Sequence, residues 1–150
     1  MIKRLVHNVD VDAGPEAVWQ VLTDLSAYPE WNPFIVRAEG EVAVGSRLTL
    51  RMQPVGGRAV TLRPTVIEAA AGRQLRWKGR SGLPHILDAD HRFAVVALAG
   101  GRSRLTQDET FSGLLVPILA RSLDRHTLPA FAAMNAAVKE RAERAVTARP

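Results

Sequence analysis

The strongest constraint on the fold comes from residues 34–113, where apolar and polar side chains alternate over several stretches. Leu48, Leu50 and Met52 alternate with polar neighbours in one of them. Alternation with a period of two is typical of antiparallel strands that bury one face and expose the other. Glycines interrupt the pattern at intervals typical of tight connections. We therefore expect about six strands in this region, preceded by a strand over residues 2–11.

Two other segments have the spacing of helices. Residues 15–25 start at Pro15, which suits the first position of a helix, and they carry apolar side chains on one side. Residues 114–147 form the longer helical pattern, and only this segment is long enough to cover the apolar face of the sheet. Pro129 lies inside it. Because proline has no backbone N–H and clashes with the preceding turn, we expect a kink or break near residues 127–128.

The segment YPEWNPF, residues 28–34, gathers three aromatic side chains around two prolines. We expect Tyr28 to leave the α region, because the residue before a proline avoids it, and we expect a short turn between helix and sheet. Tyr28, Trp31 and Phe34 are three residues apart, which places them on one side of a tight helical turn. Trp31 is expected to close one end of an internal cavity, or else to act only as a hydrophobic latch.

The composition is that of a single folded domain. The chain has 150 residues, of which 47% are hydrophobic and 23% charged, so one core can be buried in one domain spanning residues 1–150. Cysteine is absent, which excludes disulfides and thiolate metal sites. The net charge of +5 is carried by scattered arginines, not by a cluster. We therefore do not expect nucleic acid as a partner.

The apolar runs of the sequence are short. None reaches the roughly 18 residues that cross a bilayer, and the N-terminus has no apolar core of the kind found in secretory signals. We therefore expect no stable membrane insertion and a cytoplasmic location.

Residues 85–97 and 102–113 form the pattern of a hairpin that turns at residues 99–101. Side chains directly opposite each other across two strands share one face of the sheet, so the register decides which residues meet. Symmetric pairing about residue 100 gives His91 opposite Glu109, Phe93 opposite Gln107, and Val95 opposite Leu105.

His91 and Glu109 would then lie side by side among apolar side chains. A carboxylate in such surroundings is stable as an ion only when it is paired, and an imidazolium supplies that pairing. Three roles stay open: a buried structural pair, a pair that orients a polar group of a ligand, or a pair that transfers protons in catalysis. His7, His85 and His126 have no ligand-like spacing, so we expect no metal and no cofactor.

Four segments together resemble the START-related superfamily, also called SRPBCC, and within it the polyketide cyclase/dehydrase-like branch. They are residues 11–34, 91–93, 100–115 and 134–143. The resemblance implies an α+β helix-grip fold, shared with the birch-pollen allergen. In this fold a seven-stranded curved antiparallel sheet wraps around a long C-terminal helix, and two short helices lie between the first two strands. Pro129 departs from the uninterrupted helix of the superfamily.

The resemblance also implies an apolar cavity between sheet and helix that binds a hydrophobic small molecule, such as a lipid or a polyketide-like compound. Relatives in the superfamily have diverse functions, so two alternatives stay open. One is a metal-free cyclase or dehydratase that uses His91 and Glu109, and the other is a co-chaperone-like interaction module. The sequence allows an oligomer but does not indicate one. The residues expected to line the cavity are Trp31, Phe34, Leu50, Met52, Val66, Leu75, Trp77, His91, Phe93, Gln107, Glu109, Phe111, Leu119, Leu123, Phe131 and Met134.

Overall fold

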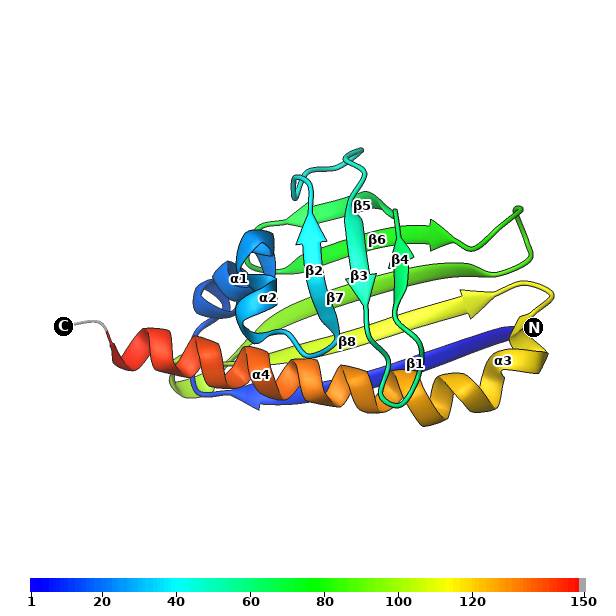
Figure 1. Ribbon diagram of the computed structural model, residues 1–150. Coiled ribbons are helices and arrows are strands. Elements are labelled where there is room, and N and C mark those ends of the chain that lie inside the picture. The colour runs from blue at the N-terminus through cyan, green and yellow to red at the C-terminus, as the bar shows by residue number, and fades with distance from the viewer. Residues whose placement is uncertain (149–150) are drawn as a thin grey trace.

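The computed structural model describes residues 1–148 and shows a curved antiparallel sheet crossed by a long C-terminal helix (Figure 1). The strands are β1 (Ile2–Val11), β2 (Ile35–Glu39), β3 (Thr49–Met52), β4 (Val60–Leu62), β5 (Thr65–Ala70), β6 (Gln74–Arg80), β7 (Asp88–Leu98) and β8 (Arg102–Ser112). The helices are α1 (Pro15–Thr23), α2 (Tyr28–Trp31), α3 (Val116–Ser122) and α4 (Leu128–Thr147). Two short helices between the first two strands are thus confirmed.

The expectation of seven strands in one sheet is wrong, because eight strands form two sheets. The larger sheet has the order β1-β8-β7-β6-β5 and the smaller one has the order β2-β3-β4. They separate between β4 and β5, at Pro64, which has no backbone N–H to donate to a neighbouring strand. Residues 45–48 join them, because the Gly45 N–H donates to the Val66 carbonyl and the Leu48 N–H donates to the Pro64 carbonyl, both at 2.8 Å.

The hairpin of β7 and β8 has the register predicted from the sequence. His91 pairs with Glu109, Phe93 with Gln107, and Val95 with Leu105. The strands turn at residues 99–101, where the two central glycines have φ values of +76° and +73°. Residues without a side chain adopt this left-handed conformation at no steric cost, so the turn maintains the symmetric pairing.

The C-terminal helical segment is interrupted where Pro129 predicts an irregularity. α3 passes into a π-helical turn, Leu123–Thr127, directly before α4 begins at Leu128. The wider π turn lies directly before Pro129, where the missing backbone N–H cannot form the regular hydrogen bond of an α-helix. α4 packs against β1 and α1, and it buries Phe131, Met134 and Val138. No helix within residues 1–148 is both long enough and apolar enough to cross a membrane.

The YPEWNPF segment forms the turn expected, but by a different backbone path. Tyr28 stays in the α region, with φ −53° and ψ −40°, which contradicts the expectation for a residue before proline. Pro29 instead occupies the first turn of α2, and the buried Tyr28 hydroxyl donates to the Leu22 carbonyl at 2.6 Å. The Tyr28 and Trp31 rings meet edge to face at 5.1 Å, and the Asn32 side chain accepts from the backbone N–H of Phe34.

Gly113 connects β8 to the segment before α3 and has the most demanding backbone of this region. Its φ is +121°, and a Cβ added there would lie 2.5 Å from the Ile86 carbonyl oxygen. Gly82 also has a positive φ, of +80°, which lies closer to the left-handed helical region, and nothing lies within 4 Å of its Cβ position. A methyl group at Gly113 is therefore opposed by a backbone clash and by a less favourable φ, whereas at Gly82 only the strain of the left-handed conformation applies.

We predict that Gly113→Ala lowers the free energy of unfolding by about 3 kcal/mol or more, because both strain and a backbone clash oppose the new methyl group. Gly82→Ala should cost only about 1 kcal/mol, which is the cost of the left-handed conformation alone. Urea denaturation of both variants measures the two losses. Equal losses would contradict the close approach of Gly113 to Ile86.

Candidate functional site

The sheet buries its inner face against α4, and most of the sixteen residues predicted to line a cavity lie in that region, whereas Trp31 ends α2 at the opposite end of the fold. All sixteen residues are buried except Trp31, Leu119 and Leu123, which are half-buried. Many of the buried ones, such as Leu50, Leu75 and Phe131, belong to one continuous hydrophobic core. Their packing contributes to stability, and their contact with a ligand stays a prediction.

His91 and Glu109 meet in the middle of this face, with a hydrogen bond between His91 Nδ1 and Glu109 Oε2. The His91 side chain is 1% exposed and the Glu109 side chain 8%. Trp77 stacks on the imidazole with ring centroids 5.2 Å apart, and Phe93 and Phe131 enclose it at 4.8 and 5.3 Å. The pair is therefore surrounded by aromatic rings on the side where the sheet meets α4.

A chain of side-chain hydrogen bonds continues from His91 to β1, and its direction follows from one backbone carbonyl. Asn135 Nδ2 lies 3.1 Å from the His7 carbonyl oxygen, which only accepts, so the Asn135 oxygen must face Gln107. Gln107 Nε2 donates to that oxygen at 2.9 Å and turns its own oxygen to His91 Nε2, 3.0 Å away. His91 Nε2 must therefore carry a proton.

The imidazole of His91 is held at both of its nitrogens. Nδ1 is hydrogen-bonded to Glu109 Oε2, and Nε2 donates to the Gln107 side-chain oxygen. His91 therefore has no nitrogen left to meet a ligand.

Glu109 retains one unengaged atom. Oε2 accepts from His91, whereas Oε1 makes no hydrogen bond within residues 1–148 and is not sealed from solvent. A carboxylate oxygen has a strong tendency to accept a hydrogen bond. Glu109 Oε1 is therefore the atom of the pair through which a polar group of a ligand can be held.

Sequence reasoning missed Asn135 and the part played by His7. A signal for each was present, because His7 lies on the inward side of the β1 pattern and Asn135 is a polar residue between Met134 and Val138 on the buried side of α4. A polar residue on an apolar helix face requires a partner. What the pattern could not supply was the partner's identity, which depends on how α4 crosses the sheet.

Half-buried apolar residues also pack on the core. They include Leu87, Leu123 and Leu128, of which only Leu123 was predicted as a lining residue. Leu123 begins the π turn, Leu128 follows it, and Leu87 lies directly before β7. Leu62 and Ala89 pack on the core as well, but they line the polar groove described below. At the opposite end of the fold, Trp31 Nε1 and Asn32 Nδ2 are buried donors without an acceptor within residues 1–148.

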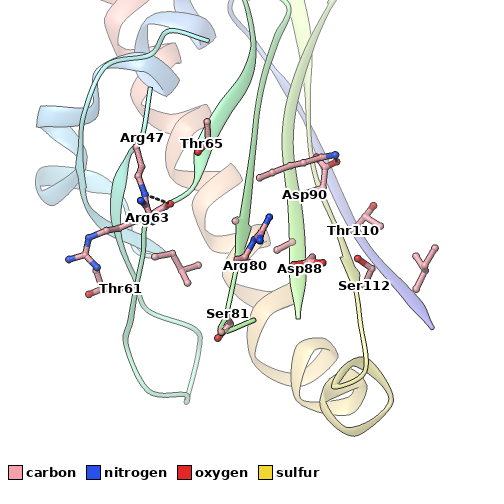
Figure 2. Close-up of a pocket in the computed structure, with 16 residues that line it drawn as sticks. Arg47, Thr61, Arg63, Thr65, Arg80, Ser81, Asp88, Asp90, Thr110 and Ser112 are labelled. Atoms are coloured by element: carbon pink, nitrogen blue, oxygen red, sulfur yellow. Dashed lines mark hydrogen bonds and ion pairs between the residues drawn. The ribbon is translucent and has the colours of Figure 1, made fainter. Parts of the chain in front are cut away.

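A polar groove of about 1040 Å³ lies on a different part of the surface, and none of the sixteen predicted residues lines it. Figure 2 shows Arg47 and Arg63 on one wall and Asp88, Asp90, Thr110 and Ser112 on the other. The hydrogen bond from Arg76 lowers the pKa of the Asp90 carboxyl below its usual value. Within residues 1–148, no three side chains of the types that bind metals are close enough to hold an ion.

Comparisons with known proteins agree with this architecture. A family described as "Polyketide cyclase / dehydrase and lipid transport" matches residues 3–148. An aromatase/cyclase from Streptomyces sp. R1128 is 23% identical, with a TM-score of 0.80 over 99% of this chain and 98% of that one. A START superfamily protein from Mycobacterium smegmatis is 24% identical, with a TM-score of 0.71 over 95% and 98%.

The norcoclaurine synthase of Thalictrum flavum, in a complex with dopamine and hydroxybenzaldehyde, is also similar in structure. It is 16% identical, with a TM-score of 0.73 over 100% of this chain and 90% of that one. A search among curated protein sequences finds no match. At these identities the solved structures establish a shared fold and carry no assignment of activity.

We predict that nitrogen NMR finds a proton on His91 Nε2, because the Gln107 oxygen that faces this nitrogen can only accept. In Glu109→Gln, the new amide N–H can donate to Nδ1, so the proton should stay on Nε2. Stability should fall by about 1 kcal/mol, because an amide makes a weaker hydrogen bond than a carboxylate. A wild-type imidazole with an unprotonated Nε2 would contradict the direction of the chain from His7.

Proposed function

We propose that this chain, which belongs to the polyketide cyclase / dehydrase and lipid transport family, binds a hydrophobic small molecule between the inner face of its sheet and its C-terminal helix. Membership in this family supports a hydrophobic small molecule as the ligand, and the fold supports a site between the sheet and the C-terminal helix. The half-buried apolar side chains Leu87, Leu123 and Leu128 supply apolar contact there. The proposal leaves the polar groove of Figure 2 outside the site.

The observation that supports the proposal most strongly is a difference within the His91–Glu109 pair: both nitrogens of His91 have hydrogen-bond partners, whereas one oxygen of Glu109 has none. Both nitrogens of His91 are occupied by Glu109 and Gln107, so its role is to orient Glu109. Glu109 Oε1 is unengaged on an otherwise apolar face. A ligand that suits this arrangement is mostly hydrophobic and carries one hydroxyl or phenol group that donates to Oε1.

Acid–base catalysis is the second candidate function, because Glu109 Oε1 could also accept a proton from a substrate. In a dehydration, Glu109 would take a proton from the carbon next to a carbonyl and return it to the departing hydroxyl, which leaves as water. His91 is a positioning residue in this scheme, because its nitrogens do not reach a substrate.

The preference for a hydroxyl tests the proposal. Naphthol and its methyl ether have similar size, but only naphthol donates a hydrogen bond. We predict that fluorescence titration finds naphthol bound more tightly by the wild type. Glu109→Gln should reduce this preference about tenfold, because an amide oxygen is a weaker acceptor than a carboxylate.

Asp108→Asn is the matched control, because Asp108 is the neighbouring residue on the outer face of β8 and pairs with Arg92 at 2.6 Å. It removes the same charge without altering the inner face, so the preference for naphthol should stay at the wild-type value. Equal binding of both probes by the wild type, or an equal effect of the two variants, would contradict a ligand contact at Glu109. Circular dichroism during heating verifies that both variants are folded.

A further inference from the structure

Within residues 1–148, every exposed leucine, isoleucine and methionine side chain lies at one end of the molecule. These residues are Met1, Ile2, Leu83, Leu114, Leu115 and Ile118, and we call them the apolar tip. Their segments are joined there by backbone contacts: Ile2 pairs with Ser112, and the Leu114 N–H donates to the His85 carbonyl at 3.0 Å. Figure 1 shows the N-terminus, α3 and the β6–β7 connection at this end.

The side chains of the apolar tip are exposed to an unusual degree. Leu83 is 73% exposed, Leu114 is 74% exposed and Ile118 is 76% exposed. The other large hydrophobic residues that are exposed within the described chain are valines from separate segments. Single exposed apolar residues are common, whereas a group of long apolar side chains at one place marks a surface for interaction.

Basic residues accompany the apolar tip. Arg80 ends β6, and Arg121 and Arg125 lie three and seven residues after Ile118, in α3 and in the π turn that follows it. All three arginines are exposed, and none forms an ion pair with a residue in the described part of the chain. The nearby acids are Asp124, which pairs with Lys3 at 2.8 Å, and Asp88, which lies opposite Arg80 on β7, so the basic groups outnumber them. The apolar tip therefore carries excess positive charge.

We propose that the apolar tip docks onto a lipid surface that bears anionic headgroups. Long apolar side chains enter the boundary of headgroups and acyl chains, while arginines beside them attract the negative headgroups. A second copy of the chain fits less well, because two tips facing each other would bring Arg80, Arg121 and Arg125 against their own copies. This proposal is independent of the ligand-binding proposal above, because docking onto vesicles is measured without any ligand in the protein.

Sedimentation with vesicles tests the docking. The probes are vesicles of phosphatidylcholine alone and vesicles of equimolar phosphatidylcholine and phosphatidylglycerol. We predict that the full chain sediments with the mixed vesicles much more than with the neutral ones, and that added salt weakens this binding because it screens the arginines.

Two variants and their controls separate the apolar and charged contributions. Leu114→Ser combined with Ile118→Ser should weaken binding to the mixed vesicles at least about tenfold, because two apolar side chains are lost from the lipid boundary. Val44→Ser changes a residue that is 68% exposed in the β2–β3 connection and should bind like the wild type. Arg121→Glu should weaken binding about fivefold or more, whereas Arg73→Glu, in the β5–β6 turn, should have little effect.

The outcomes decide between lipid and protein as the occupant of the apolar tip. Equal binding to neutral and mixed vesicles, or no binding to either, would overturn the proposal. Analytical ultracentrifugation without vesicles should find a monomer. A dimer that the Leu114 and Ile118 changes dissociate would instead assign the apolar tip to self-association. Melting temperatures equal to the wild type show that each variant is folded, since all these positions are exposed.

Discussion

The pairing of β7 with β8 decides which side chains meet the C-terminal helix. Side chains alternate between the two faces of a strand, so a shift of one residue would turn His91, Phe93, Gln107 and Glu109 outward together. The same shift would turn the ion pair of Arg92 and Asp108, which now lies on the outer face, toward the core. The glycine turn at residues 99–101 holds the symmetric pairing, and the aromatic and polar groups of the inner face depend on it.

α4 completes the site that the hairpin begins. Asn135 connects Gln107 on β8 with His7 on β1, and this connection determines the direction of every hydrogen bond that leads to His91. A polar chain of this kind is costly to bury unless each donor has an acceptor, and here the donors and acceptors match from His7 to Glu109. The consequence is a single unengaged acceptor, Glu109 Oε1, on an apolar surface.

Local patterns were sufficient to predict much of this arrangement. The hairpin register, the inward pair of His91 and Glu109 and the irregularity near Pro129 were all predicted, because each depends on nearby residues or on strict alternation. The division into two sheets at Pro64 was not, because it depends on pairing between residues far apart in the sequence. The helical conformation of Tyr28 was also missed, because burial and a tertiary hydrogen bond outweigh the effect of Pro29. The bond from Asn135 to His7 joins residues 128 positions apart, and the position of α4 on the sheet creates it.

The central claim is that the inner face of the sheet binds a hydrophobic molecule that donates a hydrogen bond. Mass spectrometry of the compounds extracted from the protein, purified from its native host, tests this claim most directly. The account predicts recovery of a hydrophobic compound with a hydroxyl or phenol group, in lower yield from Glu109→Gln than from the wild type. Recovery of no small molecule from folded wild-type protein, or of the same compound in equal yield from both, would contradict it.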